Sequence, residues 1–345
     1  MTDPAQHALA FGELVRKRPG MFAGDPGPEM LQHLIDELVS NAIDQYLRGA
    51  ATCLSVVVHA GGDIEVSDDG PGLPFDEPGP DAVTSRATVD LQQPHSTATA
   101  DGGAPHIHVH SLRGVGMALV NHLSSSLTCR SWRQGRLWEQ RFVRGEALSP
   151  ACVVAQGEGR GTSIRFRPIS EIVRVDIPDQ AMLRATLWKV AHLFGGLKIR
   201  CGDEAFHAPA GLRDYLRVLE CPTSPEEWRW SGRPSFHWRG RHANVHIDAV
   251  ARGFGKSHCS WHSWVNGRAT PLRGSHVQAF AQLLKEQGWR PETALLHVTT
   301  YDPRFAGPTR DQLVSETTRT AVREALAAAV EDYCRQQKIG NHAES

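Results

Sequence analysis

Three side chains that could act together on a polar ligand follow one another along a predicted helix. The apolar residues of segment 29–48 recur at steps of three and four, a period that indicates an amphipathic helix. Glu37, Asn41 and Asp44 are spaced by four and three positions, so they share one face beside the apolar stripe. A carboxylate there can polarise a water molecule, and an amide oxygen can bind a hard cation. The alternative interpretation of this helix alone is a solvated face without a chemical role.

A second candidate lies where a predicted hairpin ends. The segments 53–59 and 63–68 are separated by a glycine turn, which predicts two antiparallel strands. Asp68 ends the second strand and begins the sequence DDGPGLP, in which Gly70 and Gly72 would let backbone approach a flat ligand. The carboxylate of Asp68 could then accept a hydrogen bond from the amino group of adenine. On its own, this glycine pattern is also common in ordinary turns.

Two shorter patterns complete the set. The sequence RGVG opens a predicted helix directly after a long loop, and backbone N–H groups at such a position can bind phosphate. In GTSIRF, Thr162 begins a predicted strand, a place that threonine also occupies simply because it favours strands. A glycine pair before a helix is weak evidence by itself. The residues of RGVG are Arg113, Gly114, Val115 and Gly116.

The composition of the whole chain is that of a globular protein in a reducing compartment. Its 345 residues are 40% hydrophobic and 22% charged, enough for one large domain or two ordinary ones. No apolar run reaches about 18 residues and the N-terminus lacks a secretory signal, so we expect a cytoplasmic protein without membrane spans. The net charge of −1 argues against a protein that mainly coats nucleic acid. Seven scattered cysteines predict free thiols.

The elements that must position these side chains fall into two α/β units. A new run of helices and strands follows residue 168, so the boundary between the units is expected near 168–180. Segment 75–111 is rich in Pro, Gly, Asp, Thr and His, which predicts a long functional or disordered loop. Residues 1–14 show no clear periodicity, whereas 311–337 predict a long amphipathic helix.

Taken together and in this order, the four patterns resemble the GHKL ATPase superfamily. ELVSN on the first helix, DDGPG after the hairpin, RGVG after a glycine-bearing lid and GTSIRF on a strand follow the arrangement of that superfamily. VRKRPGMF and LQHLIDELVSNAID are similar to the ATPase half of bacterial gyrase and topoisomerase IV B subunits. Segments 264–280 and 301–313 resemble the transducer domain of those subunits. The resemblance spans almost the whole chain.

This resemblance implies an α+β architecture, in which a GHKL (Bergerat) ATP-binding α/β sandwich is followed by a smaller α/β transducer domain. The implied ligands are ATP and Mg²⁺. The implied parts are an N-terminal arm (1–14), the ATP-binding domain (15–170) with a lid at about 84–113, the transducer domain with its long helix (171–337) and a polar tail (338–345).

The resemblance also implies a role for each candidate residue. Glu37 would be the general base that activates the attacking water, and Asn41 would bind Mg²⁺. Asp68 would bind the amino group of adenine, supported by Thr162 through a shared water molecule. The residues implied to form the adenine wall or to meet the phosphates are Gly70, Gly72, Arg113, Gly114, Val115 and Gly116.

Several positions depart from the family pattern. The catalytic lysine of the transducer loop corresponds to Arg310, which keeps the positive charge but offers a different geometry. An acidic residue and an arginine that pair at the mouth of the family's pocket correspond to Gln45 and Pro71. Because aminocoumarin inhibitors use that arginine, we expect them to bind weakly to this chain. Arg133 matches the family's other mouth arginine and could still contribute.

Histidines in the predicted lid raise one alternative. His106, His108 and His110 alternate along a strand-like segment, which would place three imidazoles on one face as in a zinc site. No cysteine or acidic cluster nearby in the sequence completes such a site, so zinc is not the preferred interpretation. The same holds for a second group, which comprises His258, Cys259 and His262.

The resemblance leads us to expect a gyrase-B-like protein that hydrolyses ATP slowly with Mg²⁺ and forms a homodimer when ATP binds. Gyrase-type B subunits continue into a TOPRIM domain that helps to cut DNA, and no acidic cluster of that kind follows the transducer region in this sequence. DNA cleavage is therefore not expected, and a stand-alone paralogue is favoured over a fragment. Dimerisation would operate a clamp on DNA or act on a separate effector or topoisomerase subunit. The alternative is a regulatory module with little turnover; the gyrase-type motifs disfavour a mismatch-repair or chaperone-like role.

Overall fold

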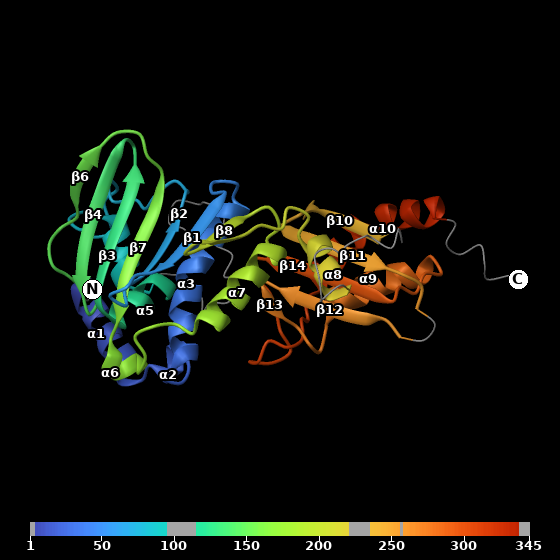
Figure 1. The fold of residues 1–345 in the computed structure, drawn as a ribbon, viewed down its shortest axis with the longest axis horizontal. Coiled ribbons are helices and arrows are strands. Elements are labelled where there is room, and N and C mark those ends of the chain that lie inside the picture. The colour runs from blue at the N-terminus through green and yellow to red at the C-terminus, as the bar shows by residue number, and fades with distance from the viewer. Residues whose placement is uncertain (1–3, 95–114, 221–234, 256–257, 338–345) are drawn as a thin grey trace, which may run out of the picture. The chain divides into compact units, whose positions relative to one another are not determined.

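Contacts between residues divide the chain into two compact units. The residues that the computed structural model describes are 4–94, 115–220, 235–255 and 258–337. Unit 1 comprises the residues up to 191 together with 196–207, and unit 2 comprises 192–195 and the chain from 208 onward. Figure 1 labels most of the helices and strands of both units.

Unit 1 combines a large sheet with several helices. Its helices, among the described residues, are α1 (Pro4–Lys17), α2 (Gly20–Ala23), α3 (Pro28–Leu47), α4 (Arg86–Gln92), α5 (Gly116–His122), α6 (Ser170–Val173) and α7 (Gln180–Leu193), which ends in unit 2. Its strands are β1 (Cys53–Val58), β2 (Ile64–Asp68), β3 (Ser124–Arg133), β4 (Arg136–Val143), β5 (Glu146–Ala147), β6 (Cys152–Gln156), β7 (Gly161–Pro168), β8 (Lys198–Cys201) and β9 (Glu204–Phe206).

The sheet of unit 1 has one covered face and one open face. Its strand order is β5-β4-β3-β7-β2-β1-β8-β9, with β6 pairing on β4. Alternate side chains such as Val56, Ile164 and Phe166 are buried on the face that α3 and α5 contact. The residues between them point to the opposite face. This two-layer arrangement confirms the predicted α/β sandwich.

Helix α3 forms where the sequence predicts it. Pro28 stands in its first turn, where a missing N–H costs nothing, and Glu29 complements the positive end of the helix dipole. Gly49 follows the helix with φ of 72°, a left-handed backbone that glycine adopts easily. The predicted apolar stripe is buried, and fully burying each such side chain stabilises the fold by roughly 1.5–3 kcal/mol. The buried stripe includes Leu31, Leu34, Ile35, Leu38 and Val39.

The predicted hairpin is also present. Strands β1 and β2 pair antiparallel, with Leu54 opposite Asp68 and Val58 opposite Ile64. The side chain of Asp69 ties the ends of the two strands together, because its Oδ1 accepts hydrogen bonds from the N–H groups of Thr52 at 2.6 Å and of Cys53 at 2.8 Å. The hairpin therefore holds Asp68 at a fixed place at the end of β2.

Two parts of unit 1 differ from the sequence prediction. Residues 4–17 form helix α1 instead of an arm without periodicity, and the ring of Phe11 packs edge-on against Phe22 and His122, with centroids 5.8 and 5.5 Å apart. Helix α4 interrupts the predicted loop 75–111. Its N-terminus is capped by Ser85, whose hydroxyl oxygen accepts a hydrogen bond from the backbone of Thr88.

The boundary between the units lies farther along the chain than the predicted 168–180. Strand β8 pairs parallel with β1, in a register that places Lys198 opposite Cys53 and Cys201 opposite Val56. Strand β9 then pairs antiparallel with β8. Both strands thus extend the sheet of unit 1, which is why the contacts assign residues up to 207 to that unit.

Unit 2 is a second α/β layer structure. Among its described residues the sheet order is β10-β11-β14-β12-β13, and Phe280, Trp289 and Val322 lie in its buried core. Its long C-terminal helix begins later than predicted, after Ser315 caps the N-terminus by accepting a hydrogen bond from the backbone of Thr318. Every described helix is too short or too polar to span a bilayer. The elements are α8 (Leu212–Glu220), α9 (Ser275–Glu286), α10 (Glu316–Gln336), β10 (Ser235–His242), β11 (Val245–Arg252), β12 (Ser260–Val265), β13 (Arg268–Ala269) and β14 (Thr293–Thr300).

Candidate functional site

A pocket in unit 1 collects several of the predicted site residues. It contains about 460 Å³ of space, part of which is open to solvent, and it lies beside α3 and the ends of β2 and β7. Apolar side chains alternate with a few polar ones along its wall, as is usual for a small-molecule site. The lining residues are Leu38, Asn41, Gln45, Val66, Asp68, Pro71, Gly72, Leu73, Met117, Thr162 and Ile164.

Asp68 and Thr162 meet in the pocket because their strands pair. The register of β2 and β7 places the two residues directly opposite each other. Oδ1 of Asp68 accepts a hydrogen bond from the N–H of Gly70 at 2.8 Å. Burial, aided by the charge of Asp69, raises the pKa of Asp68 to about 6 against the opposing effect of hydrogen bonds from the backbones of Gly70 and Thr162. The pocket thus contains a largely desolvated carboxyl group that can accept a hydrogen bond from an amino group.

Gly72 forms part of the wall and could not be replaced by a larger residue without distortion. Its φ is 81°, and a Cβ added there would lie 2.1 Å from the carbonyl oxygen of Trp132. The adjacent N–H of Leu73 donates a hydrogen bond to Oγ of Ser131 at 2.6 Å, which fixes this backbone against β3. Gly70 is outside the pocket lining, but a Cβ there would lie 2.6 Å from Oδ1 of Asp68.

Glu37 lies next to the pocket, at the start of α5. Its side chain is buried, and a Cβ added to Gly116 would lie 2.4 Å from its Oε2. Neither residue lines the pocket itself, whereas their neighbours Asn41 and Met117 do. Oε1 of Glu37 has no hydrogen-bond partner among the described residues. A buried carboxylate with a free acceptor can therefore take a hydrogen bond from a ligand or a water molecule.

His33 stands beside Glu37 and was missed by the sequence reasoning. Its Nε2 lies 3.2 Å from Oε1 of Glu37, which is ion-pair distance, although the two atoms are not aligned as a hydrogen bond. This proximity to Glu37 raises the pKa of His33, while burial opposes the rise. The spacing of four positions along one helix is the signal that could have identified it.

The segment predicted to bind phosphate, residues 113–116, is described only in part. Val115 precedes α5, and its carbonyl oxygen accepts a hydrogen bond from the N–H of Leu119 at 2.7 Å. Gly116 is the first residue of that helix. The other two predicted members of this segment, Arg113 and Gly114, lie outside the described residues.

The pocket wall contains the two residues that replace the family's ion pair. Gln45 and Pro71 both line the pocket, so the positions that form an ion pair in the resembling family are neutral here. Arg133 is engaged elsewhere. Its Nε donates a hydrogen bond to Oδ1 of Asp76 at 2.7 Å, and its Nη2 is paired with Glu77.

The remaining candidates lie in unit 2 or outside the described residues. Arg310 is half-buried in the loop between β14 and α10, with φ of 59°, and its N–H donates a hydrogen bond to the carbonyl oxygen of Gly307 at 3.1 Å. Within the described ranges, no group of three or more His, Cys, Asp or Glu side chains is arranged to hold a metal ion. The histidines at 106, 108 and 110 lie outside those ranges.

Comparison with known proteins places this geometry in a family. Residues 27–171 match the family of histidine kinase-, DNA gyrase B-, and HSP90-like ATPases. The DNA gyrase B subunit of Clostridium acetobutylicum is 28% identical over 96% of this chain and 56% of its own length. The topoisomerase 4 B subunit of Caulobacter vibrioides is 30% identical over 91% of this chain and 50% of its own length. The chain spans about half the length of these curated relatives.

A solved structure agrees over both units. The 43K ATPase domain of Thermus thermophilus gyrase B, crystallised with an aminocoumarin, matches with a TM-score of 0.78 and 26% identity. The match covers 97% of this chain and 93% of that domain. Residues 27–171 of this chain therefore form a domain of the histidine kinase-, DNA gyrase B-, and HSP90-like (GHKL) ATPases, and the chain is a homologue of the B subunits of bacterial gyrase and topoisomerase IV.

Proposed function

We propose that this chain binds ATP in the pocket of unit 1 and hydrolyses it. The observation that carries the proposal is the convergence of Asp68, Thr162, Asn41 and Gly72 on one pocket, with Glu37 buried beside it. Asp68 accepts a hydrogen bond from the amino group of adenine, which guanine lacks at that position. The apolar wall between α3 and the sheet covers the faces of the base.

The donor set beside the pocket suits a magnesium ion. Asn41 offers an amide oxygen to the pocket, and the buried Glu37 beside it has in Oε1 an oxygen that accepts no hydrogen bond from the described residues and lies 3.2 Å from Nε2 of His33. We assign the binding of Mg²⁺ to Asn41. When bound, this ion would neutralise charge on the phosphates.

Glu37 acts on the attacking water. Its carboxylate accepts a hydrogen bond from that water and orients it, and His33 holds the carboxylate in place from the preceding turn of α3. The close approach of α5 at Gly116 keeps Glu37 shielded from bulk solvent. Backbone N–H groups of Val115 and Gly116, at the start of α5, meet the phosphates. Arg310 keeps the positive charge of the lysine that the family carries in its transducer loop.

We propose that the binding of ATP makes the chain dimerise. The relatives are B subunits of gyrase and topoisomerase IV, so a clamp that closes around DNA or on a topoisomerase partner is the first candidate. A regulatory switch with little turnover is the second, and the exchange of lysine for Arg310 favours it because the two cations differ in geometry.

Calorimetric titration with ATP and a coupled ATPase assay test the proposal. Glu37→Gln should retain ATP binding and lose hydrolysis by roughly 10²–10⁴-fold, because the water is no longer oriented by a carboxylate. Glu29→Gln is the matched control, since Glu29 is exposed on the first turn of the same helix. Size-exclusion chromatography with a non-hydrolysable ATP analogue reports dimerisation. The absence of any ATP binding by the wild-type chain would refute the proposal.

A further inference from the structure

The open face of the sheet in unit 1 carries two pairs of arginines, each bridged by one carboxylate. On β3 and β4, Nε of Arg130 donates a hydrogen bond to Oε2 of Glu139 at 2.7 Å, and Nε of Arg141 donates one to Oε1 at 2.8 Å. The second pair, on β7, has the same design.

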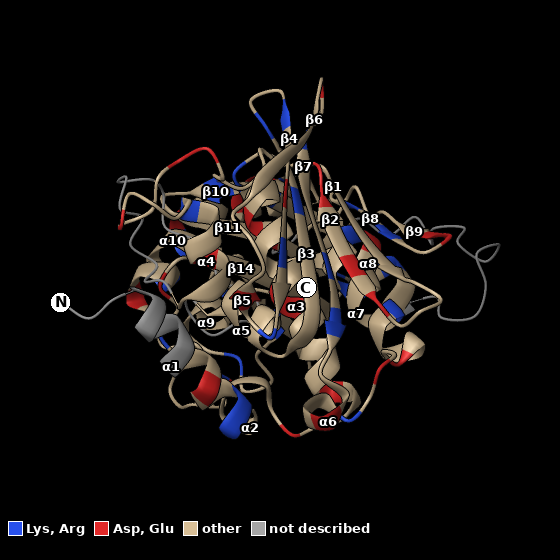
Figure 2. Ribbon diagram, turned by 90° about the vertical axis from the view of Figure 1, so that its left-hand side faces the viewer, with Lys and Arg blue, Asp and Glu red and all other residues tan. Residues whose placement is uncertain are grey.

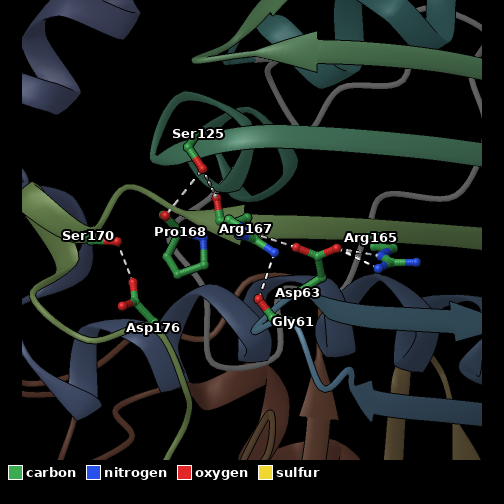
Figure 3. A network of polar contacts seen from close by, with 8 residues as sticks. All are labelled: Gly61, Asp63, Ser125, Arg165, Arg167, Pro168, Ser170 and Asp176. Atoms are coloured by element: carbon green, nitrogen blue, oxygen red, sulfur yellow. Dashed lines mark hydrogen bonds and ion pairs between the residues drawn. The ribbon is translucent and has the colours of Figure 1, made fainter.

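Figure 3 shows this second pair around Asp63. Nε of Arg165 donates a hydrogen bond to Oδ2 of Asp63 at 2.9 Å, and Nε of Arg167 donates one to Oδ1 at 2.7 Å. The carbonyl oxygen of Gly61 accepts a further hydrogen bond from Arg167 at 2.6 Å. These contacts hold the guanidinium groups in place, so a ligand would not have to order them on binding.

The four arginines lie on one face and close together. Thr128 stands opposite both Arg141 and Arg165 in the strand registers, and Arg130 stands opposite Ser163. Arg141 and Arg165 are therefore two strands apart, a separation of about 10 Å. Figure 2 shows basic residues along β3, β4 and β7.

In each bridge the two arginines are more exposed than the carboxylate between them. The side chains of Arg130 and Arg141 are 57% and 63% exposed, whereas that of Glu139 is 8% exposed. In the other pair Arg165 and Arg167 are 46% and 47% exposed, and Asp63 is 20% exposed. The carboxylates lie beneath the guanidinium groups, so the surface that meets solvent is positive. Hydrogen bonds from Arg130 and Arg141 lower the pKa of Glu139, so this bridge persists over a wide pH range.

The other charged groups near the two bridges offset one another. Glu65 accepts a hydrogen bond from Ser163 at 2.6 Å and lies 2.8 Å from Nε2 of His59. Around the two bridges the face therefore has four arginines against three carboxylates, and one of those carboxylates is next to a histidine. Farther along the same face, β8 adds Lys198 and Arg200. Since the whole chain has a net charge of −1, attraction of an anion to this face would be a local property.

We propose that this face binds the phosphate backbone of duplex nucleic acid. Guanidinium groups match phosphate oxygens in geometry, and the hydroxyl of Thr128 between them adds a hydrogen-bond donor of the kind that contacts phosphates. On β3 and β7 the uncharged residues between the arginines are Thr128 and Ser163, and the apolar side chains of Trp132 and Val143 lie at the two ends of the face. In these described strands the face therefore lacks the central aromatic or aliphatic anchor that a protein interface needs. Single strands would need several stacking platforms, and Trp132 is the one aromatic side chain that the described strands β3, β4 and β7 carry on this face.

Fluorescence anisotropy with a labelled DNA duplex tests the proposal on the full chain. In the double variant Arg130→Gln/Arg165→Gln, each carboxylate keeps one arginine, Arg141 or Arg167, so neither is left unpaired. The loss of two phosphate contacts should weaken binding roughly 60-fold at about 0.1 M salt and lower the slope of log K against log salt by about two. The matched control is Arg319→Gln/Arg335→Gln, which removes the same charge from exposed, ion-paired positions on α10.

A second variant and a second probe separate the possible outcomes. Ser126→Glu adds a carboxylate opposite Arg167 while all four arginines and both bridging carboxylates stay in place, and it should also weaken binding. The ATP affinity of each variant reports whether unit 1 is intact. Three results would each overturn the proposal. They are equal Kd values for the two double variants, no duplex binding by the wild type, and full displacement of the duplex by polyglutamate of equal charge. The last result would identify an acidic protein partner.

Discussion

Replacing Asp68 with asparagine should stabilise the ATP-free protein while weakening its binding of ATP. Burial raises the pKa of Asp68 to about 6, so its ionised form is less stable in the folded chain than in water. Asparagine has the same shape, and its oxygen can still accept the hydrogen bond that Gly70 donates. The substitution removes a buried charge and leaves the packing nearly unchanged.

The magnitude follows from the linkage between protonation and folding. The pKa of Asp68 lies about two pH units above its ordinary value, and each unit corresponds to about 1.4 kcal/mol, so ionisation costs the folded state about 3 kcal/mol at neutral pH. A raised pKa means that the folded state binds more protons, so this group's contribution to stability falls as pH rises from about 4 to about 6. Above that window the advantage of Asp68→Asn should be constant.

Urea unfolding of the ATP-free chain between about pH 4.5 and about pH 8 measures this difference. Asp69→Asn is the internal control. Burial raises the pKa of Asp69, but the hydrogen bonds from Thr52 and Cys53 outweigh burial and hold that pKa below its usual range. This neighbouring substitution should therefore destabilise the fold at neutral pH, the opposite sign from Asp68→Asn.

The binding half of the prediction uses calorimetry with ATP. Loss of a hydrogen bond to a charged acceptor costs about 1.5–3 kcal/mol, so Asp68→Asn should weaken ATP binding by roughly 10- to 100-fold. In the wild type, affinity should also fall below about pH 6 as Asp68 becomes protonated. The reasoning fails if Asp68→Asn is less stable than the wild type at neutral pH, or if its effect on stability does not change with pH.

Three further substitutions or ligands probe the same site. Gly72→Ala should destabilise unit 1 by about 2–4 kcal/mol in urea unfolding, because it combines a left-handed backbone with a contact to the carbonyl oxygen of Trp132; Gly202→Ala, at positive φ but in open space, should cost less. His33→Gln should lower kcat roughly tenfold with little change in KM, since it holds the general base without touching ATP, and an unchanged kcat would contradict that role. An aminocoumarin such as novobiocin should bind weakly in calorimetry, because the mouth is neutral and Arg133 is paired with two carboxylates; family-like affinity would contradict this.

The sequence predicted most reliably those elements whose pattern lies within one continuous segment. Helix α3 and the hairpin of β1 and β2 follow from local periodicity and a glycine turn, and both are confirmed. The place of Asn41 beside Asp68 was predictable only through the family resemblance, since α3 and β2 meet through the packing of the sandwich. The untested roles of these residues stay predictions.

Features that depend on contacts distant in sequence were missed. Strand β8 joins the sheet beside β1, although about 140 residues separate them, and no local pattern marks its partner. Strand β6 is exposed on every residue, so it shows no alternation that would indicate a strand. Helix α4 has only seven residues, which is too short for a helical period to stand out. The approach of Gly116 to Glu37 likewise arises from packing between two helices.

The pocket and the arginine face depend on the same strand register. On β7, Thr162 and Ile164 point to the covered side and line the pocket, while Ser163 and Arg165 point to the open side. Because side chains alternate along a strand, a shift of one residue in β7 would carry Arg165 into the pocket and remove Thr162 from it. Asp63, which immediately precedes β2, opposes such a shift because its carboxylate binds two arginines of β7. The bridge that prepares the arginine face therefore also fixes the register on which the proposed adenine site depends.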